Sequence, residues 1–114
     1  MKALLNGFNN QEATFFCEVE ALPNRAVALQ SSGYLSFPEE KAPFTGIVTY
    51  FNEGIASVAM QGYVKAVFNK TLPVVGICKL TTGSMGCLEV DEENGTPYTV
   101  VGVDYQNKTM EIIL

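Results

Sequence analysis

The chain has 114 residues, a length that suits one domain with a core of its own. Its net charge is −5 and its seven basic residues are scattered, which argues against binding to the phosphate backbone of a nucleic acid. Apolar residues make up 47% of the chain and charged residues 17%, so we expect apolar surface to be buried between the subunits of a homo-oligomer. A two-layer sandwich that hides these residues within one subunit is the alternative.

Residues 1–13, MKALLNGFNNQEA, are polar and rich in Asn and Gln after the first few positions. They predict a loosely held N-terminal arm in front of a single domain over residues 14–114. The start lacks the apolar stretch and cleavage site of a signal peptide, and no run of residues approaches the length of a membrane span. The sequence therefore predicts a protein made in the cytoplasm, without a membrane partner.

The first part of the domain is expected to form short strands separated by turns. Phe15, Cys17 and Val19 alternate with polar or aromatic neighbours and should share one face of a strand. The proline-flanked segment 39–43 is the only one compatible with a single helical turn. The strands predicted in this part cover residues 14–20, 26–29 and 34–37.

The centre of the chain, residues 45–68, predicts three consecutive strands with tight reversals. β-Branched and aromatic residues suit a pleated surface, and Asn52-Glu53-Gly54 supplies a turn. Glycines at positions 46, 54 and 62 argue against a long helix. We expect the strands 46–51, 55–60 and 63–68 to pair in chain order as a β-meander.

The last part of the chain is expected to contain a strand that Gly76 interrupts, either as a bulge or as a close backbone approach. In the next strand, Leu88 and Val90 should face inward and Cys87 outward. Asn107 is expected to take the left-handed conformation in the final hairpin turn. The predicted strands are 74–80, 87–91, 98–104 and 109–114, and the core-facing residues of the last one are Met110, Ile112 and Leu114.

Together these elements predict an all-β fold. Nine or ten short strands at intervals of 8–12 residues are typical of a small antiparallel sandwich or a partly open barrel, here with a C-terminal hairpin. Turn signals recur regularly, but no segment of the sequence repeats another.

The residues that usually carry catalysis are missing or isolated. The chain has no histidine, the commonest general base, and Ser84 lies in GSMG, which is not the GxSxG pattern of a nucleophile elbow. The glycine-rich phosphate-binding motifs GxxxxGK[ST] and GxGxxG are both absent from the sequence. The pair Glu39-Glu40 is interpreted as a solvated turn. The sequence therefore assigns no catalytic, cofactor-binding or metal-binding residue, and the protein is expected not to be an enzyme.

Two weaker candidates have simpler structural interpretations. The acidic loop from Asp91 to Gly95 offers oxygen ligands for calcium but lacks EF-hand spacing, so a solvated loop is favoured. Cys78 and Cys87 are candidate cross-strand neighbours, but neither has the nearby charge in sequence that makes a thiol reactive. With Cys17, they are expected to be reduced and partly buried.

Four blocks in the last three-quarters of the chain follow one another in a characteristic order. They are GIVTYFNEGIASVAMQGYVKAVF at 46–68, LPVVGICKL at 72–80, GCLEV at 86–90 and YTVVGVDYQNKTMEIIL at 98–114. In this order and spacing the chain resembles phage and prophage capsid decoration proteins, the small cement proteins that stabilise phage heads. Its three cysteines and its polar lead of 13 residues depart from that family, so no binding residue is carried over.

The resemblance implies a non-enzymatic structural protein of a phage or prophage particle. Such a protein is made in the host cytoplasm, binds the assembled shell of major capsid protein from outside, commonly as an oligomer, and stabilises it by mass action. A ligand- or carbohydrate-binding β-domain that uses Tyr34, Tyr50 or Tyr98 is the alternative function. A small β-barrel enzyme is a third.

Overall fold

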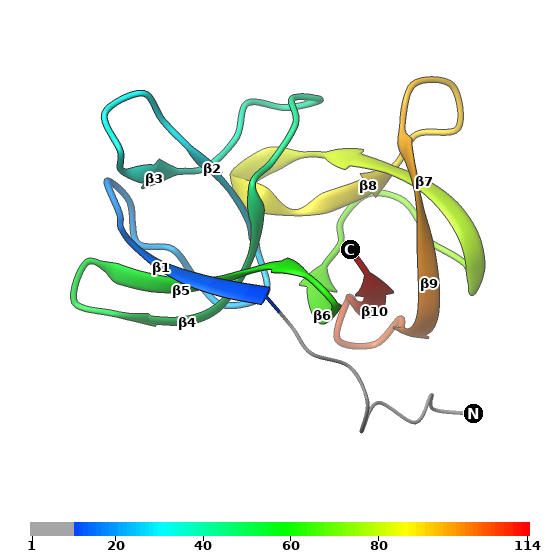
Figure 1. The fold of residues 1–114 in the computed structure, drawn as a ribbon. Helices are drawn as coiled ribbons and strands as arrows, with labels where there is room; N and C mark the ends of the chain where they lie inside the picture. Colours follow the sequence, from blue (N-terminus) through cyan, green and yellow to red (C-terminus); the bar gives the residue numbers. More distant parts are fainter. Residues whose placement is uncertain (1–10) are drawn as a thin grey trace.

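The computed structural model describes residues 11–114, which form ten β-strands and one short 3₁₀ helix, η1 (Ser84–Gly86). The strands make two antiparallel five-stranded sheets (Figure 1). The sheets pack on one another as a sandwich, and neither is closed into a barrel. The predicted all-β sandwich with a C-terminal hairpin is therefore confirmed.

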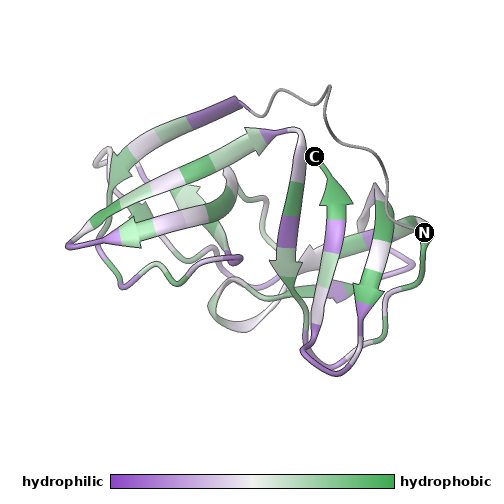
Figure 2. Ribbon diagram, turned by 90° about the horizontal axis from the view of Figure 1, so that it is seen from below, coloured by the Kyte–Doolittle hydropathy of each residue, from purple (hydrophilic) through white to green (hydrophobic). Residues whose placement is uncertain are grey.

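The first sheet, on the left of Figure 1, has the strand order β1-β5-β4-β2-β3. Its strands are β1 (Gln11–Phe16), β2 (Ala26–Leu29), β3 (Leu35–Ser36), β4 (Gly46–Asn52) and β5 (Ile55–Gln61). The second sheet has the order β6-β10-β9-β7-β8. Its strands are β6 (Tyr63–Val67), β7 (Gly76–Thr82), β8 (Leu88–Val90), β9 (Thr96–Asp104) and β10 (Thr109–Ile113). Figure 2 shows that the strands of the two sheets run in different directions.

The predicted meander is correct for β4 and β5 but wrong for the third strand. Glu53 and Gly54 form a two-residue turn, with φ of 49° and 81°, and positive φ at both positions is what a type I′ hairpin requires. Gly62 then takes φ of 104°, a conformation that glycine adopts far more readily than other residues. The chain leaves the first sheet at this corner, and β6 pairs with β10 instead of β5.

The two sheets repeat one topology. The first sheet uses residues 11–61 and the second residues 63–113, and within each half the strand order is first-fifth-fourth-second-third. In both halves the residue after the first strand meets the third strand in a single parallel bridge, which joins Cys17 to Leu35 and Phe68 to Leu88. Each sheet therefore curls until its two edge strands meet at one point.

The closing hairpins of the two halves match position by position. Each has one extra residue in its first strand, Thr49 in β4 and Val101 in β9. Alignment of these bulges superposes apolar positions of the two cores. The matched pairs are Phe15 with Ala66, Cys17 with Phe68, Val48 with Val100, Phe51 with Val103, Ala56 with Met110, and Val58 with Ile112. Only Val48 and Val100 are identical, so the repeat is visible in the structure and not in the sequence.

Each half has its own hydrophobic core. The first core contains Ala21, Val27, Leu35, Val48, Ala56 and Val58, all fully buried. The second contains Val64, Ala66, Phe68, Cys78, Leu80, Leu88, Val100, Met110 and Ile112. Three residues of the first sheet, Ala26, Ile47 and Ala59, face away from the first core and join the second. These three side chains hold the halves together by apolar packing.

Backbone and side-chain hydrogen bonds also join the halves. The amide of Val67 donates to the carbonyl of Asn24 at 2.8 Å, and the amide of Lys41 donates to the carbonyl of Thr82 at 2.8 Å. The buried hydroxyl of Thr82 contacts two further carbonyls of the first half, that of Ala42 at 2.7 Å and that of Glu39 at 3.0 Å. These contacts make the two halves one packed unit.

Two local predictions about turns are wrong. Segment 39–43 forms no helical turn, because Lys41 has φ of 65° and reverses the chain. In the final hairpin turn the left-handed residue is Lys108, with φ of 55°, and not Asn107. The Asn107 side chain instead donates a 2.8 Å hydrogen bond to Asp104, a local contact that fixes the turn in another way.

Two further predictions about strands need correction. Gly76 begins β7 with φ of 115°. It is not a bulge, because the register between β7 and β9 does not shift there. It is not a close backbone approach either, because a Cβ at this position would have no atom within 4 Å. Residues 11–13, predicted to belong to the arm, form the first half of β1 and pair with β5. The rest of the predicted arm, residues 1–10, lies outside the described residues.

Candidate functional site

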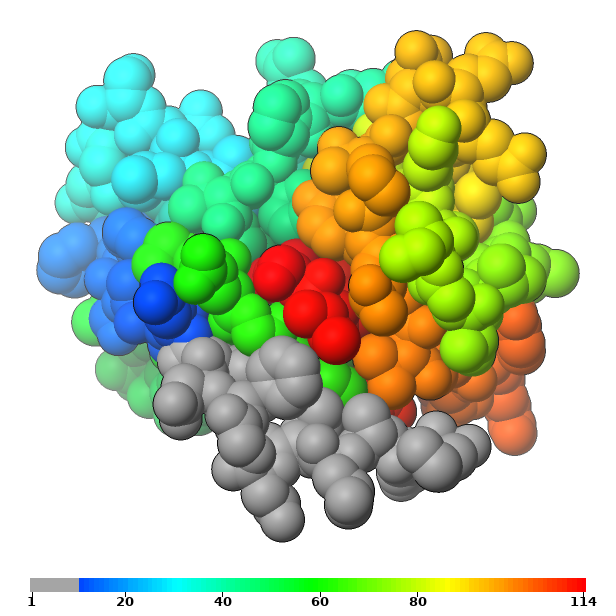
Figure 3. Space-filling view, turned by 45° about the vertical axis from the view of Figure 1, so that its right-hand side comes forward, coloured from blue at the N-terminus to red at the C-terminus, as the bar shows by residue number. Residues whose placement is uncertain are grey.

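A run of exposed aliphatic residues stands out on the second sheet. Leu72, Val74, Val75 and Ile77 are 72%, 58%, 65% and 72% exposed, and they lie in the connection between β6 and β7 and at the start of β7. We call these four residues the ridge. Figure 3 shows yellow-green residues of this part of the chain protruding on the right, away from the blue residues of β1. Single exposed apolar residues are common on surfaces, but a contiguous group marks an interaction site.

The ridge is firmly anchored from below. Pro73, between its first two members, is fully buried, and its carbonyl accepts a 2.7 Å hydrogen bond from the hydroxyl of Tyr105. Just before the ridge, the hydroxyl oxygen of Thr71 accepts a 2.7 Å hydrogen bond from the amide of Val90. A backbone that is already anchored loses little conformational entropy when a partner covers its side chains.

A groove and an open strand edge adjoin the ridge. The groove has a volume of about 390 Å³ and is lined by Leu72, Val74, Ile77, Cys78, Lys79, Val90 and Glu92. β7 pairs with β9 over residues 76–80 but with β8 only over residues 80–82. The carbonyl of Lys79 also accepts a 2.9 Å hydrogen bond from the amide of Asp91, so within the described chain residues 76–78 have a backbone partner on one side only. Backbone groups at such an edge are available to a partner.

A second exposed apolar surface lies on the first sheet. Phe16 at the end of β1 is 59% exposed, and Tyr34 just before β3 is 44% exposed. Their rings pack with centroids 5.8 Å apart. We call these two residues the aromatic pair. Ile55, the cross-strand neighbour of Phe16, is 41% exposed and extends the surface.

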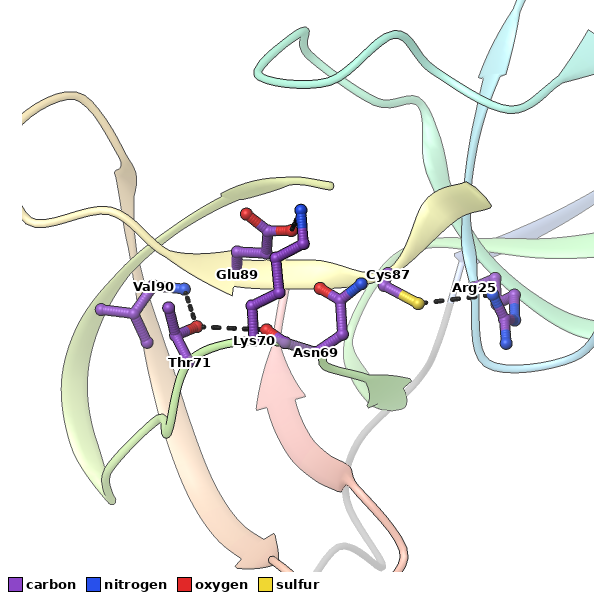
Figure 4. A network of polar contacts seen from close by, with 7 residues as sticks. All are labelled: Arg25, Asn69, Lys70, Thr71, Cys87, Glu89 and Val90. Carbon is purple, nitrogen blue, oxygen red and sulfur yellow. Dashed lines mark hydrogen bonds and ion pairs between the residues drawn. The ribbon is translucent and has the colours of Figure 1, made fainter. Parts of the chain in front are cut away.

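A polar network next to the ridge connects the two halves (Figure 4). Arg25 donates hydrogen bonds to the carbonyl of Met85 at 3.1 Å and to the Sγ of Cys87 at 3.3 Å. Lys70 lies 3.9 Å from the carboxylate of Glu89. Sequence reasoning missed the contact of Arg25 with Cys87, because the two residues are 62 positions apart.

The cysteine predictions are partly wrong. Cys87 was expected to face outward but is 6% exposed. Cys78 is not its cross-strand neighbour, because Cys78 lies opposite Tyr98 of β9, whereas β7 pairs with β8 only over Leu80–Thr82 and the carbonyl of Cys87 accepts from the amide of Gly83. All three cysteines are free, as expected. Burial raises the pKa of the Cys17 thiol, and a backbone hydrogen bond at Ala56 partly offsets the shift.

The acidic loop uses its first carboxylate to form a turn. Asp91 accepts hydrogen bonds from the amides of Glu93 at 3.2 Å and Asn94 at 3.0 Å. No group of three His, Cys, Asp or Glu residues in the described chain is placed to hold a metal ion. Ser84 lies in η1, where its carbonyl accepts a bond from the Cys87 amide, and not in a strand-to-helix elbow. The pair Glu39-Glu40 is exposed at the turn.

The tyrosines proposed for ligand binding do not lie together. Tyr98 lines a hollow of about 270 Å³ together with Lys41, Phe44, Asn94 and Thr96, and its ring is 6.1 Å from that of Phe44. Burial raises the pKa of the Tyr98 hydroxyl. Tyr50 is 62% exposed on β4, and Tyr34 belongs to the aromatic pair.

Residues 11–114 contain no helix long and apolar enough to span a membrane. The ridge and the aromatic pair are the two groups of exposed apolar residues described above, one in each half of the chain. A scan against protein-family models, a search of curated proteins and a search of solved structures each found no match to this chain.

Proposed function

We propose that this chain is a non-enzymatic structural protein of a phage or prophage particle, which binds the assembled capsid from outside and stabilises it. The observation that carries the proposal is the pair of exposed apolar surfaces on two different sheets of one packed all-β body. A protein that lies between neighbours in a shell needs more than one contact surface. The four sequence blocks that resemble capsid decoration proteins agree with this function.

The charge distribution also supports the proposal. The net charge of −5 disfavours contact with packaged DNA, which suits a protein on the outer face of a shell. Stabilisation would follow from linkage, because a ligand that binds only the assembled state shifts the equilibrium toward assembly. No turnover and no cofactor are required.

The test uses purified full-length protein and mature shells of the phage or prophage that encodes it. We expect the protein to co-sediment with expanded shells, and to raise the temperature at which they disrupt. Unexpanded procapsids and shells of an unrelated phage serve as controls. Protein that stays in the supernatant, together with an unchanged disruption temperature, would contradict the proposal.

The hollow at Tyr98 favours a second candidate function, the binding of a small ligand such as a carbohydrate. Aromatic rings of Phe44 and Tyr98 with polar neighbours Asn94 and Thr96 are the kind of lining that stacks on and hydrogen-bonds a sugar. Titration of labelled protein with a panel of sugars, followed by NMR, should shift the amides of these residues. The Tyr98→Ala variant should lose the shifts and Tyr50→Ala should keep them. An absence of shifts at millimolar sugar would remove this candidate.

A further inference from the structure

The repeat within the chain shows what a covered version of the ridge looks like. In the first half, the segment between the first two strands contains Leu22-Pro23, and in the second half it contains Leu72-Pro73. The two segments end differently. Ala26, at the start of β2, pairs with Ile47 and is fully buried, whereas its counterpart Ile77, at the start of β7, pairs with Thr99 and is 72% exposed.

The second half of the chain supplies the cover for the first segment. The amide of Val67 donates to the carbonyl of Asn24 at 2.8 Å, and Arg25 donates to the carbonyl of Met85 at 3.1 Å. Gly86 packs so closely on Ala26 that a side chain there would overlap it. The end of β6 and the loop 83–87 therefore cover residues 24–26.

The same covering surface exists on the first half, where nothing in the described chain occupies it. Phe16 is the counterpart of Val67, because the two face Ile55 and Thr109 at matching places in the repeated hairpins. Loop 30–34 is the counterpart of loop 83–87. The amide of Gln30 donates to the carbonyl of Tyr34 at 2.9 Å, as the amide of Gly83 does to that of Cys87 at 2.7 Å.

We propose that copies of this chain associate head to tail, with the ridge of one copy covered by the aromatic pair and loop 30–34 of the next. The contact would repeat between chains the packing that joins the two halves within one chain. Within residues 11–114 each copy has one surface of each kind that the chain leaves uncovered, so the interface is heterologous. The inference does not depend on the proposed function, because it requires no capsid.

The chemistry of the two surfaces is complementary. The ridge offers four aliphatic side chains, and the aromatic pair offers two rings that can pack on them, with no charged residue in either set. The backbone matches as well. Because the Val67 amide points away from β10 and toward Asn24, the Phe16 amide in the matching position points away from β5. It is placed to donate to a carbonyl of the partner within residues 74–77.

The experiment measures the association of full-length protein by sedimentation velocity over a concentration series. We expect the wild type to form species larger than its 12.4 kDa monomer. Ile77→Lys on the ridge and Phe16→Lys in the aromatic pair should each weaken association at least about tenfold, as a charge in the centre of an apolar interface does. Tyr50→Lys, at an equally exposed residue outside both surfaces, is the control and should associate like the wild type.

Mixing the two variants separates head-to-tail packing from other arrangements. The Ile77→Lys chain keeps its aromatic pair and the Phe16→Lys chain keeps its ridge, so one productive contact is possible between them. The mixture should form dimers and nothing larger. Val74→Lys and Tyr34→Lys provide a second pair of variants with the same expectation if either first variant unfolds.

Three results would overturn the proposal. The wild type could remain monomeric at the highest concentration reached. The Phe16→Lys variant could associate as well as the wild type, which would indicate ridge-to-ridge packing. Finally, the mixture of the two folded variants could remain monomeric, which would show that the two surfaces do not bind each other.

Discussion

The hydroxyl of Tyr105, in the turn between β9 and β10, donates a 2.7 Å hydrogen bond to the carbonyl of Pro73, which lies between the first two residues of the ridge. The ring of Tyr105 also packs edge-on against Phe68, with centroids 6.3 Å apart. One side chain thus ties the ridge to the second core. The same contact makes the ridge a defined surface rather than a loose loop.

Replacing Tyr105 by Phe should therefore remove one hydrogen bond and keep the ring contact. We expect the free energy of unfolding to fall by about 0.5–1.5 kcal/mol, toward the lower end because the tyrosine is half exposed. Urea denaturation followed by circular dichroism measures the change. Tyr50→Phe, whose hydroxyl makes no hydrogen bond in the described chain, should leave stability unchanged. Equal stability of both variants would show that the Pro73 contact contributes nothing.

Thr82→Val tests the hydrogen bonds that join the two halves. The Thr82 side chain is 1% exposed, and the carbonyls of Ala42 at 2.7 Å and Glu39 at 3.0 Å share its single hydroxyl proton. Valine has a similar shape but no donor, so we expect a loss of about 1–3 kcal/mol in the free energy of unfolding. Thr99→Val, at an exposed position of β9, should change stability by less than about 0.5 kcal/mol. A Thr82→Val variant as stable as the wild type would contradict the expectation.

Gly46→Ala tests the close approach of β4 and β5. A Cβ at Gly46 would overlap the carbonyl of Ala59 and lie 2.6 Å from a methyl carbon of Val58. Because backbone must move to make room, we expect a loss of about 1–3 kcal/mol or more in stability. Gly102→Ala is the matched control, since the nearest atom to its Cβ is the end of the Glu111 side chain at 3.6 Å. Thermal unfolding should separate the two variants clearly.

Asp104 should make stability depend on pH. Its pKa is lowered, first by the hydrogen bond from the Asn107 side chain and then by backbone amides in the same turn. A carboxyl whose folded pKa lies below its unfolded value stabilises the protein above the unfolded value, about 3.9 for Asp, and loses this effect as pH falls through the folded value. The melting temperature of the wild type should thus exceed that of Asp104→Asn at neutral pH.

The difference between the two melting temperatures should stay constant down to about pH 5 and shrink below it. Asn107→Ala removes the side chain that donates the main hydrogen bond to Asp104. The stability of this variant should therefore depend less on pH than that of the wild type, as should the stability of Asp104→Asn. If the gap between the wild type and Asp104→Asn were as large in strong acid as at neutral pH, the carboxylate would not be the cause.

The sequence was sufficient to predict a strand, and the face that each of its residues occupies, where a single local rule such as alternation or turn chemistry decides the outcome. Alternation correctly placed Met110 and Ile112 inside, and the turn at Glu53-Gly54 has the conformation that its glycine predicts. Sheet membership could not be predicted in the same way. Whether β6 continues from β5 depends on the backbone at Gly62, and its pairing with β10 joins residues more than forty positions apart.

The candidate surfaces were also beyond prediction from sequence. Apolar residues at 74, 75 and 77 are normally interpreted as core, because such side chains are usually buried. They are exposed here because β8 has only three residues and pairs with β7 no further than Leu80. The repeat is not readable from the sequence for a related reason. Its matched core positions keep apolar character but differ in side-chain volume, as in Phe15 with Ala66 and Ala56 with Met110.

The division of the chain at Gly62 has a consequence for synthesis on the ribosome. All five strands of the first sheet lie in residues 11–61, so they can pair before the second half has been translated. Until then Ile47 and Ala59, which later pack into the second core, would face water on the nascent chain. The newly made first half therefore exposes apolar residues that stay in contact with water until the second half of the chain, or a chaperone, covers them.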